Sequence, residues 1–194
     1  MKQKFFTACV LLVFSYSYSQ TEATTKDGKK VILNKDMTWM YADCANLVET
    51  KTYPGGKVMT SSKENIKISA DGKTGIDISL LKGTSSIIYN FAAITNDVKC
   101  VVKDAPGTVE FTDGSKITIK HMSDLNCKGN FSCFLGSATG TGTEGTALQS
   151  KKIKKITLQY TKKENDSFTN YNEDFIVTTE QADKIFKTIQ CLSN

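Results

Sequence analysis

Side chains suited to chemistry gather around the single histidine of the chain. A cysteine thiol can act as a nucleophile when a histidine takes its proton and a carboxylate orients the imidazole ring. His121 could act as the base, Asp124 could orient it, and Cys100 or Cys44 could supply the thiol. These residue types define one hypothesis, a small envelope hydrolase that uses His121 with a cysteine nucleophile. Against it, Cys100 lies in the apolar run 98–102, and burial makes a thiol inert.

The same region also contains residue types that bind zinc. His121, Asp124, Cys127 and Cys133 could contribute ligands, but the chain lacks the C-x-x-C and H-x-x-x-H spacings of structural zinc sites. We therefore expect no metal. His121 continues the alternation of the isoleucines in 117–119, which predicts a neutral, hydrogen-bonded histidine at the end of a strand.

Disulfide bonds are a simpler role for the cysteines of an exported chain. The segment NCKGNFSC brings Cys127 and Cys133 together through a turn at 129–130, so we predict a bridge between them. An odd number of cysteines remains after the N-terminal segment, so one thiol stays free or pairs with another chain. A second bridge would use two of Cys44, Cys100 and Cys191, and the sequence does not choose among these three.

The segment 140–145 reads GTGTEG and matches the G-x-G-x-x-G pattern of dinucleotide-binding folds. That pattern needs a hydrophobic strand directly before the glycines and a packed helix directly after them, in a parallel β-α-β unit. The residues that follow, TALQSKK, contain few apolar side chains for such a helix, and no Gly-Lys-Ser/Thr occurs. We therefore predict a polar loop over 123–150, either functional or mobile, and expect neither a nucleotide nor another cofactor.

Four lysines close together could meet an anionic partner such as a polysaccharide or nucleic acid. They are Lys151, Lys152, Lys154 and Lys155. The alternative, which we favour, is an edge strand that lysines protect against aggregation. All 25 basic residues are lysines. The absence of arginine argues against a nucleic-acid partner, because arginine is the usual reader of phosphate and guanine.

The N-terminus has the three parts of a signal peptide. Lys2 and Lys4 precede the apolar run FFTACVLLVF, and small residues at 17 and 19 precede Gln20. The run is too short to span a bilayer. We predict a signal peptide over 1–19, cleavage between Ser19 and Gln20, and a periplasmic or secreted protein without a transmembrane segment.

The rest of the chain alternates apolar and polar residues, which predicts strands joined by turns at Asp-Gly pairs. The first hairpin is expected over about 25–42, with Trp39 as its core anchor. A helix is expected over about 179–192, capped by Thr178 and Gln181. These elements predict a single α+β domain over 20–194: a mostly antiparallel sheet with a C-terminal amphipathic helix packed on one face.

The segment DGKKVILNKDMTWMY (27–41) resembles the opening of small secreted proteins of Gram-negative bacteria, especially of the Bacteroidetes type. The resemblance covers about seventeen residues from Thr25 to Tyr41. It implies an exported bacterial protein and no particular activity. The turn differs from the usual pattern, because Met37 stands where those proteins carry glycine.

Taken together, the residues indicate an exported, non-enzymatic binding or envelope-associated module. The alternative is the hydrolase built on His121. The partner, expected in the envelope or outside the cell, is not identified by the sequence, and neither is the oligomeric state.

Overall fold

A computed structural model describes residues 21–26, 28, 30–33, 39–82, 86–137, 143–164 and 167–193. The predicted signal peptide, 1–19, lies outside the described residues. Within them, no helix is both long enough and apolar enough to cross a membrane.

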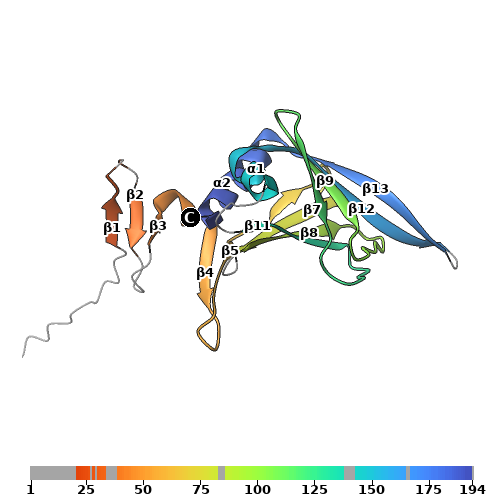
Figure 1. The fold of residues 1–194 in the computed structure, drawn as a ribbon, viewed down its shortest axis with the longest axis horizontal. Coiled ribbons are helices and arrows are strands. Elements are labelled where there is room, and N and C mark those ends of the chain that lie inside the picture. The colour runs from red at the N-terminus through yellow and green to blue at the C-terminus, as the bar shows by residue number, and fades with distance from the viewer. Residues whose placement is uncertain are drawn as a thin grey trace, which may run out of the picture.

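The described residues form three antiparallel sheets and two α-helices, arranged as Figure 1 shows. A small sheet has the order β1-β2-β3, a second β10-β9-β12-β13, and the largest β11-β8-β7-β5-β4, with β6 paired to β7. The elements are β1 (Thr21–Thr24), β2 (Lys30–Leu33), β3 (Trp39–Tyr41), the 3₁₀ turn η1 (Ala42–Cys44), β4 (Val48–Thr52), β5 (Val58–Ser62), β6 (Ile66–Ile68), β7 (Gly75–Lys82), β8 (Ser86–Ile94), β9 (Pro106–Phe111), β10 (Lys116–Lys120), β11 (Asn130–Ser137), α1 (Thr143–Ser150), β12 (Ile153–Glu164), β13 (Ser167–Ile176) and α2 (Thr179–Ser193).

Strand alternation builds one core between the two larger sheets. Along β7, β8 and β9 buried residues alternate with less buried ones, as expected for strands with one face in the core. Fully buried side chains come from both sheets; they include Ile76, Ile78, Leu80, Phe111, Phe131, Ile156, Leu158 and Tyr160. The predicted Asp-Gly turns are present between β6 and β7 and between β9 and β10, where Gly72 and Gly114 have positive φ.

Helix α2 closes this core and confirms the predicted α+β class. Its N-terminus is the expected capping box: Thr178 N–H donates to Gln181 Oε1 over 2.9 Å, and Gln181 N–H donates to Thr178 Oγ1 over 3.3 Å. Gln181 also donates from its amide to the Lys67 carbonyl over 2.8 Å, which fixes the helix to β6. The apolar stripe packs against β12 of one sheet and β4 to β7 of the other; its buried members are Ala182, Ile185, Ile189 and Leu192.

The prediction of a polar loop over 123–150 is wrong, because this stretch contains strand β11 and helix α1. β11 pairs with β8 and buries Phe131 and Cys133 between polar neighbours. Helix α1 buries Leu148 and contacts α2, β10 and β11. One apolar side chain in a short segment gives almost no periodic signal, although it is enough to anchor the helix against an existing core.

The N-terminal hairpin forms, but Trp39 is not its core anchor. β2 and β3 pair antiparallel with Leu33 opposite Trp39, and both side chains are largely exposed. Val31 is the buried member of β2. Val31, Leu33, Trp39 and Tyr41 share one face of the hairpin, and this face turns inward at Val31 but not at Trp39. The turn at Met37 lies outside the described residues.

Two pairs of cysteines lie at disulfide distance, and they correct the predicted pairing. Cys44 in η1 pairs with Cys191 in α2, and Cys100 pairs with Cys127. Cys133 is free and buried. The predicted Cys127–Cys133 bridge is wrong because Cys133 belongs to β11 and points into the core, whereas Cys127 lies beside Cys100 through the bridge between Val101 and Asn126.

Candidate functional site

A cleft of about 640 Å³ opens beside β12 and β13, next to segment 97–100. Its lining combines charged, aromatic and apolar side chains: Asp97, Val98, Lys99, Cys100, Lys162, Tyr171 and Glu173. At its base Lys99 Nζ forms an ion pair with the Glu173 carboxylate. Only 9% of the Lys99 side chain and 28% of the Glu173 side chain are exposed. Removing two charges from water costs free energy, so a contribution to stability does not by itself explain an ion pair in this position.

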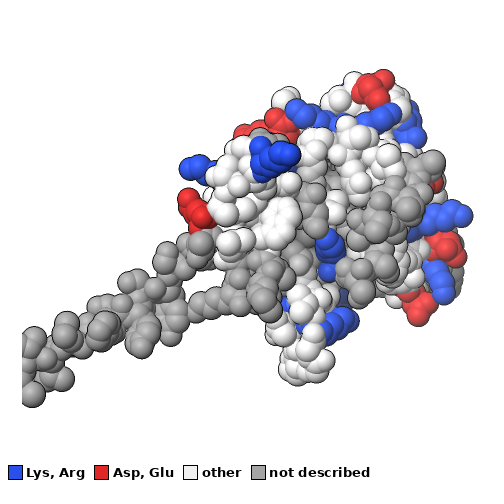
Figure 2. All heavy atoms as spheres, turned by 60° about the vertical axis from the view of Figure 1, so that its left-hand side comes forward, with Lys and Arg blue, Asp and Glu red and all other residues white. Residues whose placement is uncertain are grey.

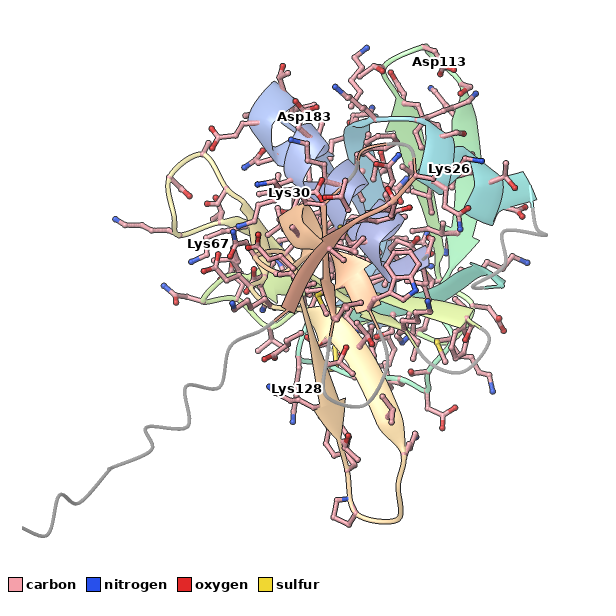
Figure 3. The ribbon with its side chains drawn as sticks, turned by 90° about the vertical axis from the view of Figure 1, so that its left-hand side faces the viewer. Lys26, Lys30, Lys67, Asp113, Lys128 and Asp183 are labelled. Carbon is pink, nitrogen blue, oxygen red and sulfur yellow. A yellow bond between two sulfur atoms is a disulfide. The ribbon has the colours of Figure 1, made fainter. Side chains whose placement is uncertain are left out.

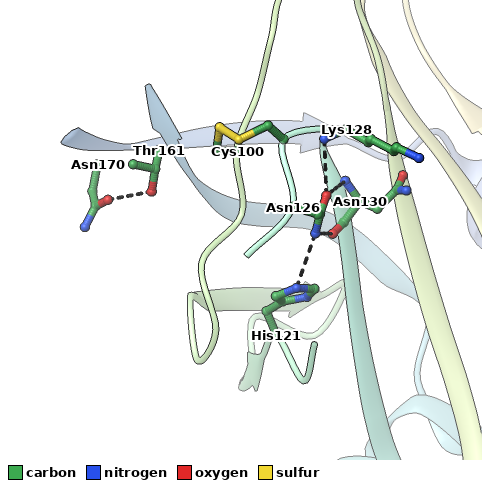
Figure 4. The surroundings of a disulfide bond; sticks show 8 residues. Cys100, His121, Asn126, Lys128, Asn130, Thr161 and Asn170 are labelled. Atoms are coloured by element: carbon green, nitrogen blue, oxygen red, sulfur yellow. Dashed lines mark hydrogen bonds between the residues drawn. A yellow bond between two sulfur atoms is a disulfide. The ribbon is translucent and has the colours of Figure 1, made fainter. Parts of the chain in front are cut away.

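Lys99 is held in this position by backbone pairing on both sides of it. Cys100 and Thr161 exchange two backbone hydrogen bonds of 3.1 and 2.7 Å, which places the segment beside β12 beyond the end of β9. Gly129 N–H donates to the Lys99 carbonyl over 2.8 Å. The Cys100–Cys127 bridge adds a covalent link at the same point (Figure 4). Lys99 therefore points inward, and its ammonium lies 5.1 Å from the centre of the Tyr160 ring.

Two tyrosines form the aromatic part of the site. Tyr160 and Tyr171 are register partners on β12 and β13, with ring centroids 6.0 Å apart. The hydroxyl of Tyr160 is buried and has no hydrogen-bond partner among the described residues. Burial, together with the negative charge of Glu173, raises the pKa of Tyr160. Burial and the carboxylates of Glu173 and Asp97 also raise the pKa of Tyr171, so both hydroxyls stay protonated at neutral pH.

The charges of the cleft balance one another. Lys99 and Lys162 supply two positive charges, and Asp97 and Glu173 supply two negative charges. Donors and acceptors therefore stand side by side with little net field, next to the half-buried ring of Tyr171. Such a cleft can hold a small polar molecule through directed hydrogen bonds and one apolar face.

No protein-family model, curated protein or solved structure matches the chain. The chemistry of this cleft is therefore the basis for a functional conclusion.

A larger hollow of about 900 Å³ lies between the N-terminal sheet and the end of α2. Lys30, one of its lining residues, is labelled in Figure 3. The charged lining residues of the hollow are Lys30, Asp43 and Lys187, all exposed. Because these three charged groups are exposed, they remain hydrated. The hollow differs in this respect from the cleft, where the Lys99–Glu173 ion pair is largely removed from water.

The structure places His121 in a structural role. The ring is buried, and its Nδ1 accepts a 2.9 Å hydrogen bond from the Ser132 N–H. The Asn126 amide lies 3.5 Å from Nε2 and also binds the backbone of Asn130, as Figure 4 shows. Burial lowers the pKa of His121, which agrees with the predicted neutral, hydrogen-bonded histidine. Asp124 is highly exposed and lies 3.7 Å from Lys103.

The residues of the hydrolase hypothesis do not assemble into a nucleophile and base. Cys44 and Cys100 both lie at disulfide distance from another cysteine, so neither offers a thiol. The remaining thiol, Cys133, is buried, and burial raises its pKa to about 12. Among the described residues, no three His, Cys, Asp or Glu side chains gather as a metal site. Nothing in this geometry supports the hydrolase.

The four lysines of the anionic-partner hypothesis each have a carboxylate partner. Lys151 contacts Asp113 at 2.8 Å, Lys152 contacts Asp183 at 2.6 Å, Lys154 contacts Glu110 at 3.1 Å, and Lys155 contacts Asp174 at 3.0 Å. Figure 2 shows basic and acidic residues interspersed on the face in view. The edge-strand alternative is wrong, because β12 lies between β9 and β13.

The GTGTEG segment also has a different context from the one expected. Its last three residues begin α1, and Gly145 is buried in that helix. The strand before it, β11, pairs antiparallel with β8, and the strand after it, β12, belongs to the other large sheet. The helix therefore does not connect two parallel neighbours, which is the arrangement that a dinucleotide fold requires.

Lys99, Tyr171 and Glu173 were not selected by sequence reasoning. Tyr171 and Glu173 do share the parity of buried Phe175 on β13, so alternation could have placed them on the inner face. Lys99 gives no such signal. In this segment the apolar Val98 is 71% exposed and the charged Lys99 is buried, the reverse of what residue type predicts.

Proposed function

We propose that the protein is an exported, non-enzymatic binding module whose ligand site is the cleft at Lys99, Tyr171 and Glu173. The observation that carries the proposal is the desolvated Lys99–Glu173 pair at the base of an open cleft. A structural ion pair is usually replaceable by apolar residues, whereas a pair that faces a cleft offers a donor and an acceptor to a ligand.

The cleft best fits a small, neutral, hydroxyl-rich ligand, such as a saccharide. Glu173 and Asp97 can accept hydrogen bonds from neighbouring hydroxyls, while Lys99 and Lys162 can donate to hydroxyl oxygens. The ring of Tyr171 offers an apolar face to the C–H groups of a sugar ring. The balanced charge of the lining does not favour an anion or a cation.

Export is part of the same proposal. Two cysteine pairs at disulfide distance are typical of proteins that fold in an oxidising compartment. The N-terminal sequence, with its basic start and short apolar run, supports passage through the inner membrane.

Calorimetric titration of the mature protein with a panel of neutral oligosaccharides tests the proposal. Substituting Tyr171→Ala should weaken the binding of any sugar that binds by roughly tenfold or more, and Glu173→Gln should weaken it less. Tyr53→Ala is the matched control, because Tyr53 is an exposed tyrosine at the tip of the β4–β5 hairpin. Equal affinities of the Tyr171→Ala and Tyr53→Ala variants would show that the ligand binds elsewhere.

A further inference from the structure

Strand β13 is a long edge strand whose charged side chains are both acidic, Glu173 on the inner face and Asp174 on the outer face. Among the described strands only β12 pairs with it, and the register runs without a break from Glu164–Ser167 to Lys155–Ile176. Its sequence, SFTNYNEDFI, contains no lysine and no proline. Natural edge strands are normally short, bulged, or guarded by lysine or proline, because an open edge pairs with other chains. In Figure 1, β13 forms the outer margin of its sheet.

The backbone pairing of β12 shows which groups of β13 point outward. Thr161 exchanges both of its backbone hydrogen bonds with Cys100, on the side away from β13. Backbone groups alternate in direction along a strand, so the N–H and C=O groups of the even-numbered residues of β12 point toward β13. Those of the odd-numbered residues of β13 point toward β12. The Val177 N–H, which donates to the Lys154 carbonyl, follows the same rule. The backbone groups of the even-numbered residues from Phe168 to Ile176 therefore point away from the sheet.

The side chains of the same even-numbered residues form the exposed face of β13. Phe168 and Ile176 lie at the two ends and are 58% and 66% exposed. Asn172 lies midway between them, with Asn170 and Asp174 on either side. Along this face the residue types are therefore symmetric about Asn172: a polar residue lies on each side of it, and an apolar residue lies beyond each polar one.

We propose that a second copy of this chain pairs with β13 along this edge, around a two-fold axis at Asn172. In that register Phe168 lies opposite the partner's Ile176, and Asn170 lies opposite the partner's Asp174. The outward-pointing groups would form about ten backbone hydrogen bonds, and the two four-stranded sheets would become one. The Asn170 side chain is already oriented, because Thr161 Oγ1 donates to its Oδ1 over 2.7 Å and leaves the NH₂ group as a donor.

A second copy fits this edge because the strand is its own complement. Cross-strand contacts stabilise a sheet when apolar residues face apolar residues and donors face acceptors. A two-fold operation on β13 meets both conditions at once, and it also covers the two exposed apolar side chains. The edge strand β4 of the largest sheet is different from β13. It is short, and it carries Lys51, which forms an ion pair with Glu49.

The dimer would also join the two ligand clefts, a consequence that rests on the proposed function. Tyr171 and Glu173 lie on the inner face of β13, so Tyr171 would stand opposite the partner's Glu173. Each cleft would then receive a carboxylate from the other copy. The dimer itself depends only on the edge of β13 and is tested without any ligand.

Analytical ultracentrifugation of the mature protein over a range of concentrations tests the dimer. We expect the wild type to dimerise, and we expect either F168K or I176E to raise the dissociation constant by roughly tenfold or more, since each places a charge against an apolar side chain. The double variant F168K/I176E should regain much of the lost affinity, because the two new charges face each other across the interface. This rescue is specific to the register centred on Asn172.

Asn172→Pro is a second, independent test. The Asn172 N–H points outward, so proline removes a donor from the interface while the β12–β13 ladder keeps its bonds. We expect this variant to be a folded monomer by circular dichroism and sedimentation, and Asn172→Thr to remain a dimer. A monomeric wild type, a dimer that ignores all of these changes, or a double variant no better than the single ones would overturn the proposal.

Discussion

The backbone N–H of Ser132 donates a 2.9 Å hydrogen bond to Nδ1 of His121, where a backbone carbonyl would stand in a regular ladder. The Met122 N–H donates to the Ser132 carbonyl over 2.9 Å, so the end of β10 and the start of β11 are joined by one side-chain and one backbone bond. The His121 ring also lies against Phe131, with centroids 5.4 Å apart. This link needs an unprotonated Nδ1, because a protonated nitrogen cannot accept a hydrogen bond.

Folding stability is therefore expected to fall as the pH drops below about 6.5. Burial lowers the pKa of His121 in the folded protein, so the unfolded chain binds this proton at a higher pH than the folded chain does. The contribution is complete above the unfolded pKa and is lost progressively as the pH falls toward the folded pKa. Urea unfolding at pH 7.5, 6.5 and 5.5 measures the slope. His121→Asn can still accept the Ser132 bond and should show a flatter profile; an equal slope in both proteins would assign the effect elsewhere.

The Lys99–Glu173 pair is expected to show strong coupling in a double-mutant cycle. Glu173→Leu alone leaves a desolvated ammonium and should lower the free energy of unfolding by about 2 kcal/mol or more. The double variant Lys99→Met/Glu173→Leu removes both charges and should lie within about 1 kcal/mol of the wild type. Thermal or chemical unfolding measures each corner of the cycle.

Lys51→Met is the control for that cycle, because the Lys51–Glu49 pair is exposed and should contribute little. Additive effects of the two substitutions at Lys99 and Glu173 would show that the ion pair is not desolvated as the structure indicates. Loss of sugar binding in the double variant, with stability retained, would link the pair to the ligand site.

Sequence patterns identified the elements whose signal repeats along the chain. The period of two in 76–80 and 87–91 and the helical stripe of 182–189 were sufficient to predict the antiparallel sheet and α2. The pairing of Cys100 with Cys127, by contrast, depends on two irregular segments that meet beside β12, and nothing local encodes it. Lys99 was missed for the same reason: its burial follows from contacts with residues distant in sequence.

Removing the Cys44–Cys191 bridge is expected to destabilise the packing of α2. The bridge joins residues 147 positions apart and links η1 to the last turn of the helix. Cys44→Ser with Cys191→Ser should reduce the free energy of unfolding by about 2–5 kcal/mol, because a long loop of the unfolded chain is no longer closed. Denaturant unfolding under non-reducing conditions measures the loss. Under reducing conditions the wild type should approach the variant, and equal stability before reduction would contradict the bridge.

Thiol chemistry separates the two possible pairings of Cys127. The structure leaves Cys133 as the free thiol, buried opposite Tyr89, with its pKa raised to about 12 by burial. The native, oxidised protein should therefore not react with a thiol reagent at pH 8, and the denatured protein should show one thiol. Digestion after lysine without reduction should release the peptide CVVK (100–103) linked to HMSDLNCK (121–128). A link between the peptides of Cys127 and Cys133, with Cys100 alkylated, would restore the pairing expected from the sequence and would free segment 97–100 from its anchor beside the cleft.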